Sequence, residues 1–250
     1  MKKVFNAYSS YYNLLYKDKD YVSEADYIVD LIKQHKPEAK TLVEFGSGTG
    51  KHALLFCEKG FQVNGVEPSA EMLKIAQSNS HTNLSFTHAS IESLALAEKF
   101  DVATALFHVV SYLNENEELI NSFRNIHKHL NEGGLFIFDL WYTPAVLSQI
   151  PEKRTKVTED DHIKVIRNAT PVNHWNKNII DVIYDINVFD KENKEDYVLS
   201  ETHNMRHFSI PEIELLAKLT GFEIIKTEEF LSGETPGPNT WGVCFVLSKV

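Results

Sequence analysis

Short apolar runs alternate with longer amphipathic runs between residues 41 and 140. The apolar runs predict five strands, at Thr41–Phe45, Phe61–Val66, Leu84–His88, Asp101–Leu106 and Leu135–Leu140. The amphipathic runs predict three helices, at Lys51–Lys59, Ser69–Asn79 and Glu115–His129. Strands that alternate with helices in this way are typical of βαβ units and a parallel sheet. We therefore expect a doubly wound α/β fold in this part of the chain.

The alternation of strand and helix stops after Leu140. Three β-patterned runs follow, at His162–Thr170, Ile179–Phe189 and Tyr197–Phe208. Polar turns separate them, which favours antiparallel hairpins and predicts an inserted antiparallel sheet. The first pattern then resumes with a helix from Ile210 to Leu219 and two closing strands, Phe222–Phe230 and Trp241–Ser248. The chain thus divides into an N-terminal part (1–40), a core (41–140), an insertion (141–208) and a closing part (209–250).

A helix is predicted before the first strand. Ile28, Leu31 and Ile32 share one face, and Ser23 is a candidate N-cap. Five tyrosines fall within the fourteen residues Tyr8–Tyr21 just before this helix. They are either a surface-packing segment or a lid, because their apolar bodies and polar tips suit them to cover a ligand.

Composition narrows the partners. The 250 residues are 43% apolar, and 25 basic against 35 acidic residues give a net charge of −10. This charge argues against nucleic acid, which is bound by clustered Lys and Arg. No run approaches the ~20 apolar residues that span a bilayer, so we expect no membrane partner and a cytoplasmic location. Cys57 and Cys244 are expected to be buried thiols, and the scattered histidines predict no metal site.

The first predicted strand runs into three alternating glycines, Gly46, Gly48 and Gly50, and then into a helix. Glycine is needed where the backbone turns sharply or must approach a ligand closely. About twenty residues later, Glu67 ends the second strand, where a carboxylate can accept hydrogen bonds from ribose hydroxyls. Lys51 stands where the dinucleotide pattern G-x-G-x-x-G has its third glycine. The stretch therefore favours a nucleoside cofactor other than a dinucleotide.

The stretch Glu44-Phe-Gly-Ser-Gly-Thr-Gly50 resembles the first motif of the class I S-adenosylmethionine-dependent methyltransferases. The resemblance covers roughly residues 41–140 and the two closing strands. It implies a seven-stranded Rossmann-like sheet and S-adenosylmethionine as the cofactor, with Glu44 helping to hold the amino group of its methionine end. Glu67 matches the ribose-binding position of the family. After it come Pro68, Ser69 and Met72, which resemble the stretch of the family that runs beside the adenine.

Two further stretches extend the resemblance. Phe100–His108 resembles the motif at the end of the fourth strand, which implies cofactor contacts for Leu106 and Phe107. Leu130–Asp139 resembles the turn into the fifth strand. Many members carry an acidic residue after the third strand that meets the adenine amino group, whereas this chain has Ser90. A neutral hydroxyl makes a weaker hydrogen bond than a carboxylate.

The predicted chemistry is methyl transfer, which mainly requires that the two reactants be aligned. An amine acceptor must arrive unprotonated, and a hydroxyl acceptor benefits from a general base. His108 follows the fourth strand, where acceptors lie in this family, and imidazole titrates near neutrality. Tyr112 is the second catalytic candidate. Either side chain is also compatible with ordinary packing.

Aromatic and basic residues near the same edge of the sheet are candidates for acceptor binding. Trp141 and Tyr142 follow the fifth strand directly and can hold a ring, a sugar face or the sulfonium by cation–π attraction. Trp241 ends the loop that connects the closing strands, and Arg206 is a candidate for binding a phosphate. Each of these has packing or a local ion pair as its alternative role.

A narrower resemblance comes from three features together: the tyrosine-rich start, the stretch Asp139–Pro144 and the insertion leading to Arg206–Phe208. In combination they resemble the N-methyltransferases of nucleotide-linked amino sugars in bacterial glycan and macrolide pathways. The resemblance implies that the insertion walls the acceptor or forms a dimer contact. Macrolide-pathway members have a histidine near the position of Tyr112. The tyrosines that would close over the cofactor are Tyr12, Tyr16 and Tyr21.

Three other functions stay open from the sequence. The first is O-methylation of a small hydroxylated or carboxylated metabolite, with His108 as the base. The second is a nicotinamide-dependent oxidoreductase, which Lys51 at the third glycine position argues against. The third is a catalytically silent, methyltransferase-like binding subunit. In every case we expect a small-molecule ligand and a monomer or homodimer.

Overall fold

The computed structural model describes residues 14–192 and 196–250. Its core is a twisted sheet in the order β3, β2, β1, β4, β5, β11, β10. The strands from β3 to β5 are parallel, and β11 runs antiparallel to both β5 and β10. The predicted doubly wound, seven-stranded α/β fold is confirmed. The core strands are β1 (Thr41–Phe45), β2 (Gln62–Glu67), β3 (Leu84–His88), β4 (Phe100–Ala105), β5 (Leu130–Tyr142), β10 (Phe222–Glu229) and β11 (Gly242–Lys249).

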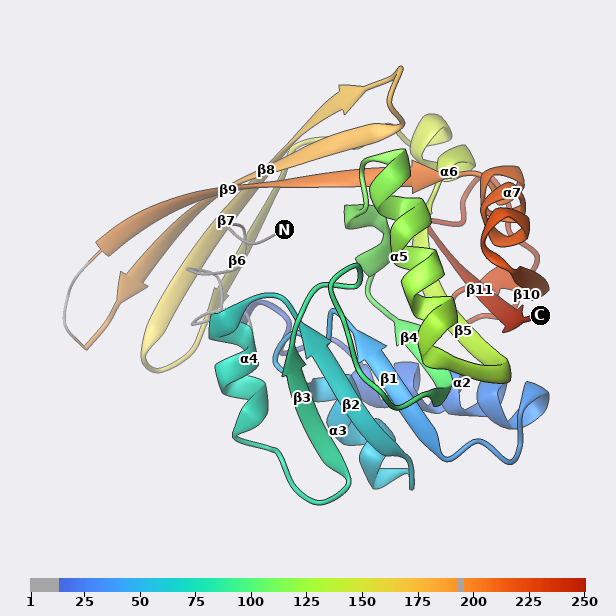
Figure 1. The fold of residues 1–250 in the computed structure, drawn as a ribbon. Helices are drawn as coiled ribbons and strands as arrows, with labels where there is room; N and C mark the ends of the chain where they lie inside the picture. The colour runs from blue at the N-terminus through green and yellow to red at the C-terminus, as the bar shows by residue number, and fades with distance from the viewer. Residues whose placement is uncertain (1–13, 193–195) are drawn as a thin grey trace.

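Helices cover both faces of this sheet, as Figure 1 shows. On one face, Ile28 of α2 and Phe56 of α3 are buried against the sheet. On the other, Phe123 of α5 packs edge-on against Phe136 of β5, with ring centroids 5.2 Å apart. The two-sided burial explains why the core strands read as continuous apolar runs. The helices are α2 (Tyr21–His35), α3 (Lys51–Glu58), α4 (Ala70–Gln77), α5 (Asn116–His129), α6 (Thr143–Ser148), α7 (Ile210–Thr220) and the short 3₁₀ helix η1 (Val109–Tyr112).

The start of α2 differs from the prediction. Asp20, not Ser23, is the N-cap, because its carboxylate accepts a 2.9 Å hydrogen bond from the Ser23 backbone N–H. An aspartate caps as well as a serine and also favours the positive end of the helix dipole. Tyr21 therefore belongs to the first turn of α2 rather than to the segment before it.

The insertion is an antiparallel sheet of four strands, not three, that projects from the core (Figure 1). The strand missed by the sequence analysis is β6, at the edge of the sheet, where only Thr158 is buried. Its sequence is too polar to predict a strand. The strand forms because β6 pairs with β7 along its whole length. The last strand of the insertion joins the core by a short parallel pairing with the end of β5. The four strands are β6 (Arg154–Glu159), β7 (Ile163–His174), β8 (Ile179–Asp190) and β9 (Asp196–Phe208).

Leu15 anchors the segment before α2, because its side chain packs between the core and the insertion. Its side chain is completely buried in a small cluster with Met72 of α4 and with Val165, Ile186 and Val188 of the inserted sheet. Burying a leucine side chain stabilises a fold by roughly 1.5–3 kcal/mol. Residues 14–16 are thereby held over the edge of the core where the glycine turn lies.

Candidate functional site

One cavity of about 340 Å³ lies at the carboxyl ends of the parallel strands, between the core, the segment before α2 and the inserted sheet. In doubly wound sheets this is the edge at which ligands bind. Twelve residues predicted from the sequence line it: Tyr16, Tyr21, Gly46, Gly48, Glu67, Pro68, Met72, Leu106, Phe107, His108, Tyr112 and Trp141. Nine lining residues were not predicted: Ser47, Thr49, Lys51, His52, Val109, Val182, Tyr184, His203 and Met205.

The glycine turn has a backbone that other residues would strain. Gly46 and Gly48 have φ values of +66° and +57°, in the left-handed region that favours glycine. A Cβ on Gly46 would lie 2.5 Å from Cγ2 of Val109, so the turn could not pack against η1. Among the described residues, a Cβ on Gly48 would have only Met72 within 4 Å, at 3.8 Å from its sulfur. Gly48 thus leaves open space in the cavity beside Met72.

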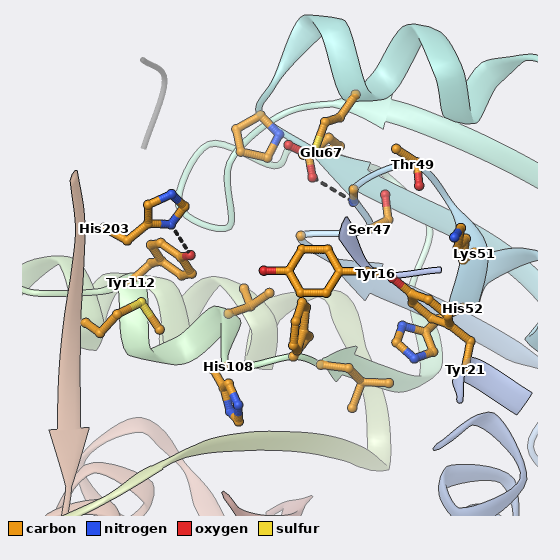
Figure 2. A pocket seen from close by; sticks show the side chains of 18 of the residues that line it. Tyr16, Tyr21, Ser47, Thr49, Lys51, His52, Glu67, His108, Tyr112 and His203 are labelled. Carbon is orange, nitrogen blue, oxygen red and sulfur yellow. Dashed lines mark hydrogen bonds between the residues drawn. The ribbon is translucent and has the colours of Figure 1, made fainter. Parts of the chain in front are cut away.

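Glu67 is held at the floor of the cavity by backbone donors, as Figure 2 shows in part. Its Oε2 accepts a 2.8 Å hydrogen bond from the Gly48 N–H, and its Oε1 accepts a 2.7 Å bond from the Ser69 N–H. The residue is only 4% exposed, and burial raises the pKa of its carboxyl. A carboxylate has about four acceptor positions, so two remain for a ligand. Glu67 therefore joins the glycine turn to the predicted ribose position.

Glu44 lies behind the cavity wall rather than on it. Its Oε1 is 3.6 Å from Nδ1 of His52, which does line the cavity, and the other ring nitrogen of His52 is 2.8 Å from Glu24. Oε2 of Glu44 is buried without a hydrogen-bond partner among the described residues. Burial, with a smaller contribution from the charge of nearby Glu67, raises the pKa of Glu44 to about 8. The site thus holds a buried acceptor that a cationic ligand group would satisfy.

The two described tyrosines of the predicted lid both line the cavity. Tyr16 packs edge-on against Phe107, with ring centroids 5.2 Å apart, and its hydroxyl accepts a 3.2 Å hydrogen bond from Arg167 of β7. Tyr21 packs against His52 at 4.9 Å. Tyr12 lies outside the described residues. The contacts of Tyr16 tie the N-terminal segment to both the core and the inserted sheet.

Phe107 and His108 follow β4 in a strained conformation, with φ values of +65° and +62°. Residues other than glycine seldom adopt such values, and they cluster at functional sites. Nδ1 of His108 is 2.7 Å from Oδ2 of Asp139. The strained turn places the His108 imidazole at the edge of the cavity with its Nδ1 against this carboxylate.

The inserted sheet supplies the opposite wall of the cavity. Val182 and Tyr184 of β8, and His203 and Met205 of β9, line it. In each pair the residues are two apart, so they share one face of a strand. The hydroxyl of Tyr112 is 2.7 Å from Nδ1 of His203, the contact drawn dashed in Figure 2. The alternation of side chains along the predicted strands could have shown which residues of β8 and β9 share a face. It could not show which face meets the cavity, because that depends on the register between β9 and β5.

Several predicted cofactor residues do not line the cavity. Gly50 is the N-cap of α3, and a Cβ there would lie 2.7 Å from the Phe86 ring. Ser69 caps α4 and donates its N–H to Glu67. The hydroxyl of Ser90 is 2.9 Å from that of Ser93. Gly50 and Ser69 thus shape the site from behind, while the predicted contact of Ser90 with adenine has no support from its surroundings.

Three predicted acceptor residues also lie off the cavity. Tyr142 is the N-cap of α6 and packs against the core. Arg206 donates a 2.8 Å hydrogen bond to the side chain of Asn116, and its guanidinium lies over the Phe208 ring. Trp241 lines a separate shallow pocket and packs edge-on against Trp141, with ring centroids 5.8 Å apart. Of the aromatic candidates after β5, only Trp141 reaches the cavity.

Other sequence-based expectations concern cysteines, metals and membranes. Cys244 is buried as predicted, but Cys57 of α3 is only half-buried, at the margin of the core. Within residues 14–192 and 196–250 there is no group of three or more acidic, histidine or cysteine side chains placed to bind a metal ion. Over the same residues, no helix has the length and apolar character needed to cross a membrane.

Comparisons with known proteins identify the class of enzyme. Residues 42–134 match the family described as "Methyltransferase domain". The chain is 30% identical over 139 residues to dTDP-3-amino-3,4,6-trideoxy-alpha-D-glucopyranose N,N-dimethyltransferase of Streptomyces venezuelae, over 55% of this chain and 58% of that relative. The match therefore spans little more than half of the relative.

Two solved structures share the fold over almost the whole chain. DesVI of Streptomyces venezuelae is 26% identical with a TM-score of 0.81, and the alignment covers 97% of this chain and 98% of DesVI. CalS10 of Micromonospora echinaspora, an amino pentose methyltransferase solved with S-adenosylmethionine bound, is 20% identical with a TM-score of 0.77, over 100% and 99% of the two chains. The fold and site define a class I methyltransferase. The chain is an S-adenosylmethionine-dependent methyltransferase, as its sequence resemblance implied.

The residues of the cavity fit this cofactor. Glu67 offers buried acceptor positions to the ribose, and the turn through Gly46 and Gly48 leaves room for a ligand against the backbone. The unsatisfied Oε2 of Glu44 lies behind this turn, where the sequence resemblance placed the cationic amino group of the methionine end. When bound, the cofactor supplies a methyl group already activated by the positive charge of the sulfonium.

Proposed function

We propose that this enzyme methylates the amine of a small molecule, most specifically of a nucleotide-linked amino sugar. The observation that carries the proposal is that one cavity joins the glycine turn and Glu67 to a separate group of acid–base side chains. Figure 2 shows this arrangement, with Glu67 and the glycine turn apart from the pair formed by Tyr112 and His203. A donor and an acceptor molecule can therefore occupy one enclosed space.

Two further observations support an amino-sugar acceptor. The inserted sheet, which closes the cavity here, is present in a chain that aligns over nearly its whole length with an amino pentose methyltransferase. The Streptomyces venezuelae relative acts on a dTDP-linked amino sugar, although it matches only about half of this chain. In this proposal the core holds the cofactor, and the insertion with Val182, Tyr184 and Met205 bounds the acceptor.

The chain's own residues then have separate tasks. Glu67 and the turn through Gly46 and Gly48 hold the cofactor, and Tyr16 with Phe107 shields it from water. Alignment of two reactants in this way can account for several kcal/mol of the barrier. Tyr112 and His108 lie at the acceptor end, where an ammonium proton must be removed before the nitrogen can attack.

A second candidate function, O-methylation, is favoured by one specific contact. His108 is paired through Nδ1 with buried Asp139, an arrangement that orients an imidazole as a general base for a hydroxyl. A hydroxyl acceptor depends on such a base more than an amine that reaches the cavity already neutral. The two functions therefore differ in how strongly they need His108.

The test is methyl transfer from S-adenosylmethionine to dTDP-3-amino-3,4,6-trideoxy-α-D-glucopyranose and to its 3-hydroxy counterpart, followed by mass spectrometry. We expect one or two methyl groups on the amine, and His108→Ala to retain most of this activity. Transfer to the hydroxyl alone, abolished by His108→Ala, would establish O-methylation instead. Cofactor binding without transfer to any amine or hydroxyl in a broad acceptor panel would indicate a silent binding subunit and overturn the proposal.

A further inference from the structure

His203 has no place in the sequence motifs and comes from the insertion, yet it contacts the catalytic candidate Tyr112. The Tyr112 hydroxyl is 2.7 Å from Nδ1 of His203, a short hydrogen bond between two residues that both line the cavity. Because His203 is only 4% exposed, its ring is held in place by the surrounding side chains. Tyr184 packs edge-on against it, with ring centroids 4.9 Å apart.

A carboxylate lies on the far side of the same imidazole. Oε2 of Glu201 is 3.7 Å from Nε2 of His203, and the side chains of the two residues are 8% and 5% exposed. Glu201 and His203 are two apart on β9 and so share one face of the strand. The two atoms are too far apart for a hydrogen bond, but a negative charge on this side of the ring favours the tautomer with its proton on Nε2, which leaves Nδ1 to accept from the Tyr112 hydroxyl.

We propose that Tyr112 and His203 form a proton relay that prepares the acceptor amine, an inference that rests on the proposed function. The acceptor ammonium passes a proton to the Tyr112 oxygen, while Tyr112 passes its own hydroxyl proton to Nδ1 of His203. One N–H bond breaks at the acceptor and one forms at Nδ1, so the positive charge moves to the imidazole. The lone pair left on the acceptor nitrogen is then free to take the methyl group, and the relay is reset through water after product release.

The surroundings of the pair suit this transfer. Burial raises the pKa of Tyr112 well above its usual range, so the tyrosine stays neutral and passes a proton on rather than losing it. Besides Glu201, the charged and titratable groups facing the pair are Tyr16, Tyr184 and Arg167. Arg167 disfavours a new positive charge on the His203 imidazole, and the carboxylate of Glu201 favours it. His203 acts through Tyr112 and is therefore a positioning residue for the proton.

The experiment compares Tyr112→Phe, His203→Gln and the double variant with the wild type, using dTDP-3-amino-3,4,6-trideoxy-α-D-glucopyranose at pH 6.5 to 9.5. At pH 7 we expect each single variant to lose about 10²–10³-fold in kcat, within the range of proton-transfer catalysis. The double variant should lose no more than the poorer single variant, because the residues act as a unit. The deficit should shrink as the pH rises, because the acceptor then arrives as the free amine.

Controls separate this role from a structural one. Tyr197→Phe on β9 and His162→Gln in the exposed turn before β7 should keep wild-type rates, and all variants should bind S-adenosylhomocysteine as the wild type does. An equal loss in kcat at every pH would make the pair structural and overturn the relay, as would unchanged rates in both single variants.

One measurement does not depend on turnover. Imidazole ¹⁵N shifts of the wild type, with His203 assigned from its loss in His203→Gln, should show the proton on Nε2. A proton on Nδ1 would overturn the relay for any acceptor, because that nitrogen could then accept nothing. Failure of the proposed function looks different, because the wild type itself would then methylate no amine while the Nε2–H tautomer is still observed.

Discussion

His108 and Asp139 are joined through both the side chain and the backbone of the histidine. Nδ1 of His108 is 2.7 Å from Oδ2 of Asp139, and the His108 backbone N–H lies 3.2 Å from each carboxylate oxygen. Asp139 is only 1% exposed; burial by itself raises the pKa of its carboxyl, but the charge of His108 and its hydrogen bonds prevail and lower it. A buried, ionised carboxylate thus fixes both the strained turn after β4 and the orientation of the imidazole.

Replacing Asp139 with asparagine should separate its role in fixing the turn after β4 from its role in orienting the His108 imidazole. Asp139→Asn keeps an oxygen for the His108 N–H but removes the charge that orients the ring. If the acceptor is a hydroxyl, we expect kcat to fall about 10²-fold or more, as for loss of a general base. If it is an amine served by Tyr112, the loss should be less than tenfold. Steady-state kinetics with both acceptors measure this, and Asp161→Asn on an exposed turn is the control.

Glu67 should be the main determinant of cofactor affinity. Glu67→Gln removes the charge while keeping the shape, and hydrogen bonds to charged groups contribute roughly 1.5–3 kcal/mol. We therefore expect the Kd for S-adenosylhomocysteine to rise about 10- to 150-fold in calorimetric titrations. The exposed Glu71→Gln on α4 should leave the Kd unchanged. Equal affinity of wild type and Glu67→Gln would remove Glu67 from the cofactor site.

A substitution at Gly48 tests whether the turn leaves room for the cofactor, and a second glycine controls for backbone strain. Gly48→Ala adds a methyl group whose only neighbour within 4 Å, in the part of the chain that the structure describes, is Met72. The fold should therefore tolerate it apart from the strain of a positive φ, about 1–2 kcal/mol. Gly60→Ala also places an alanine at a positive φ, +99°, and no other described residue lies within 4 Å of the added methyl group. We expect both variants to lose unfolding free energy in urea, but only Gly48→Ala to lose cofactor binding. Comparable binding by the two variants would mean that Gly48 does not face the cofactor.

The core and the cofactor end of the cavity were predictable because their information is local. The first strand, the glycine turn, the helix after it and Glu67 all lie within residues 41–67, and each has its own physical requirement. Glu44 shows the limit of this reasoning. It is part of the predicted motif, yet its side chain lies behind His52, because the sequence does not say which side chains form the inner layer of a cavity wall.

The acceptor end was predicted less well because it depends on pairing between distant strands. Arg206 and His203 lie three apart on β9, and so on opposite faces. Arg206 is the residue that the sequence predicts for acceptor binding, but the pairing of His207 with Trp141 turns His203 and Met205 toward the cavity instead. A shift of one residue in that register would reverse the choice. Registers between strands sixty residues apart are not encoded locally.

Glu44 leads to a prediction about stability and pH. Burial raises its pKa to about 8 in the folded protein, whereas an ordinary glutamate titrates near 4.3 in the unfolded chain. Between these pH values the folded state holds a proton that the unfolded state has released, so the contribution of Glu44 to stability falls as the pH rises. At its steepest the fall is about 1.4 kcal/mol per pH unit. The contribution of the protonated Glu44 to the free energy of unfolding is therefore fully present below about pH 4 and is lost by about pH 8.

Glu44→Gln removes this dependence without changing the shape of the side chain. We expect the unfolding free energy of the variant, relative to the wild type, to increase steadily from pH 5 to pH 8 in urea titrations. Other titrating groups are common to both proteins and cancel in the difference. The exposed Glu58→Gln should show a constant difference over the same range, and a constant difference for Glu44→Gln as well would mean that Glu44 is ionised in the fold. The variant should also bind S-adenosylmethionine more weakly, because a glutamine cannot give up a proton and become a carboxylate when the ammonium group of the cofactor arrives.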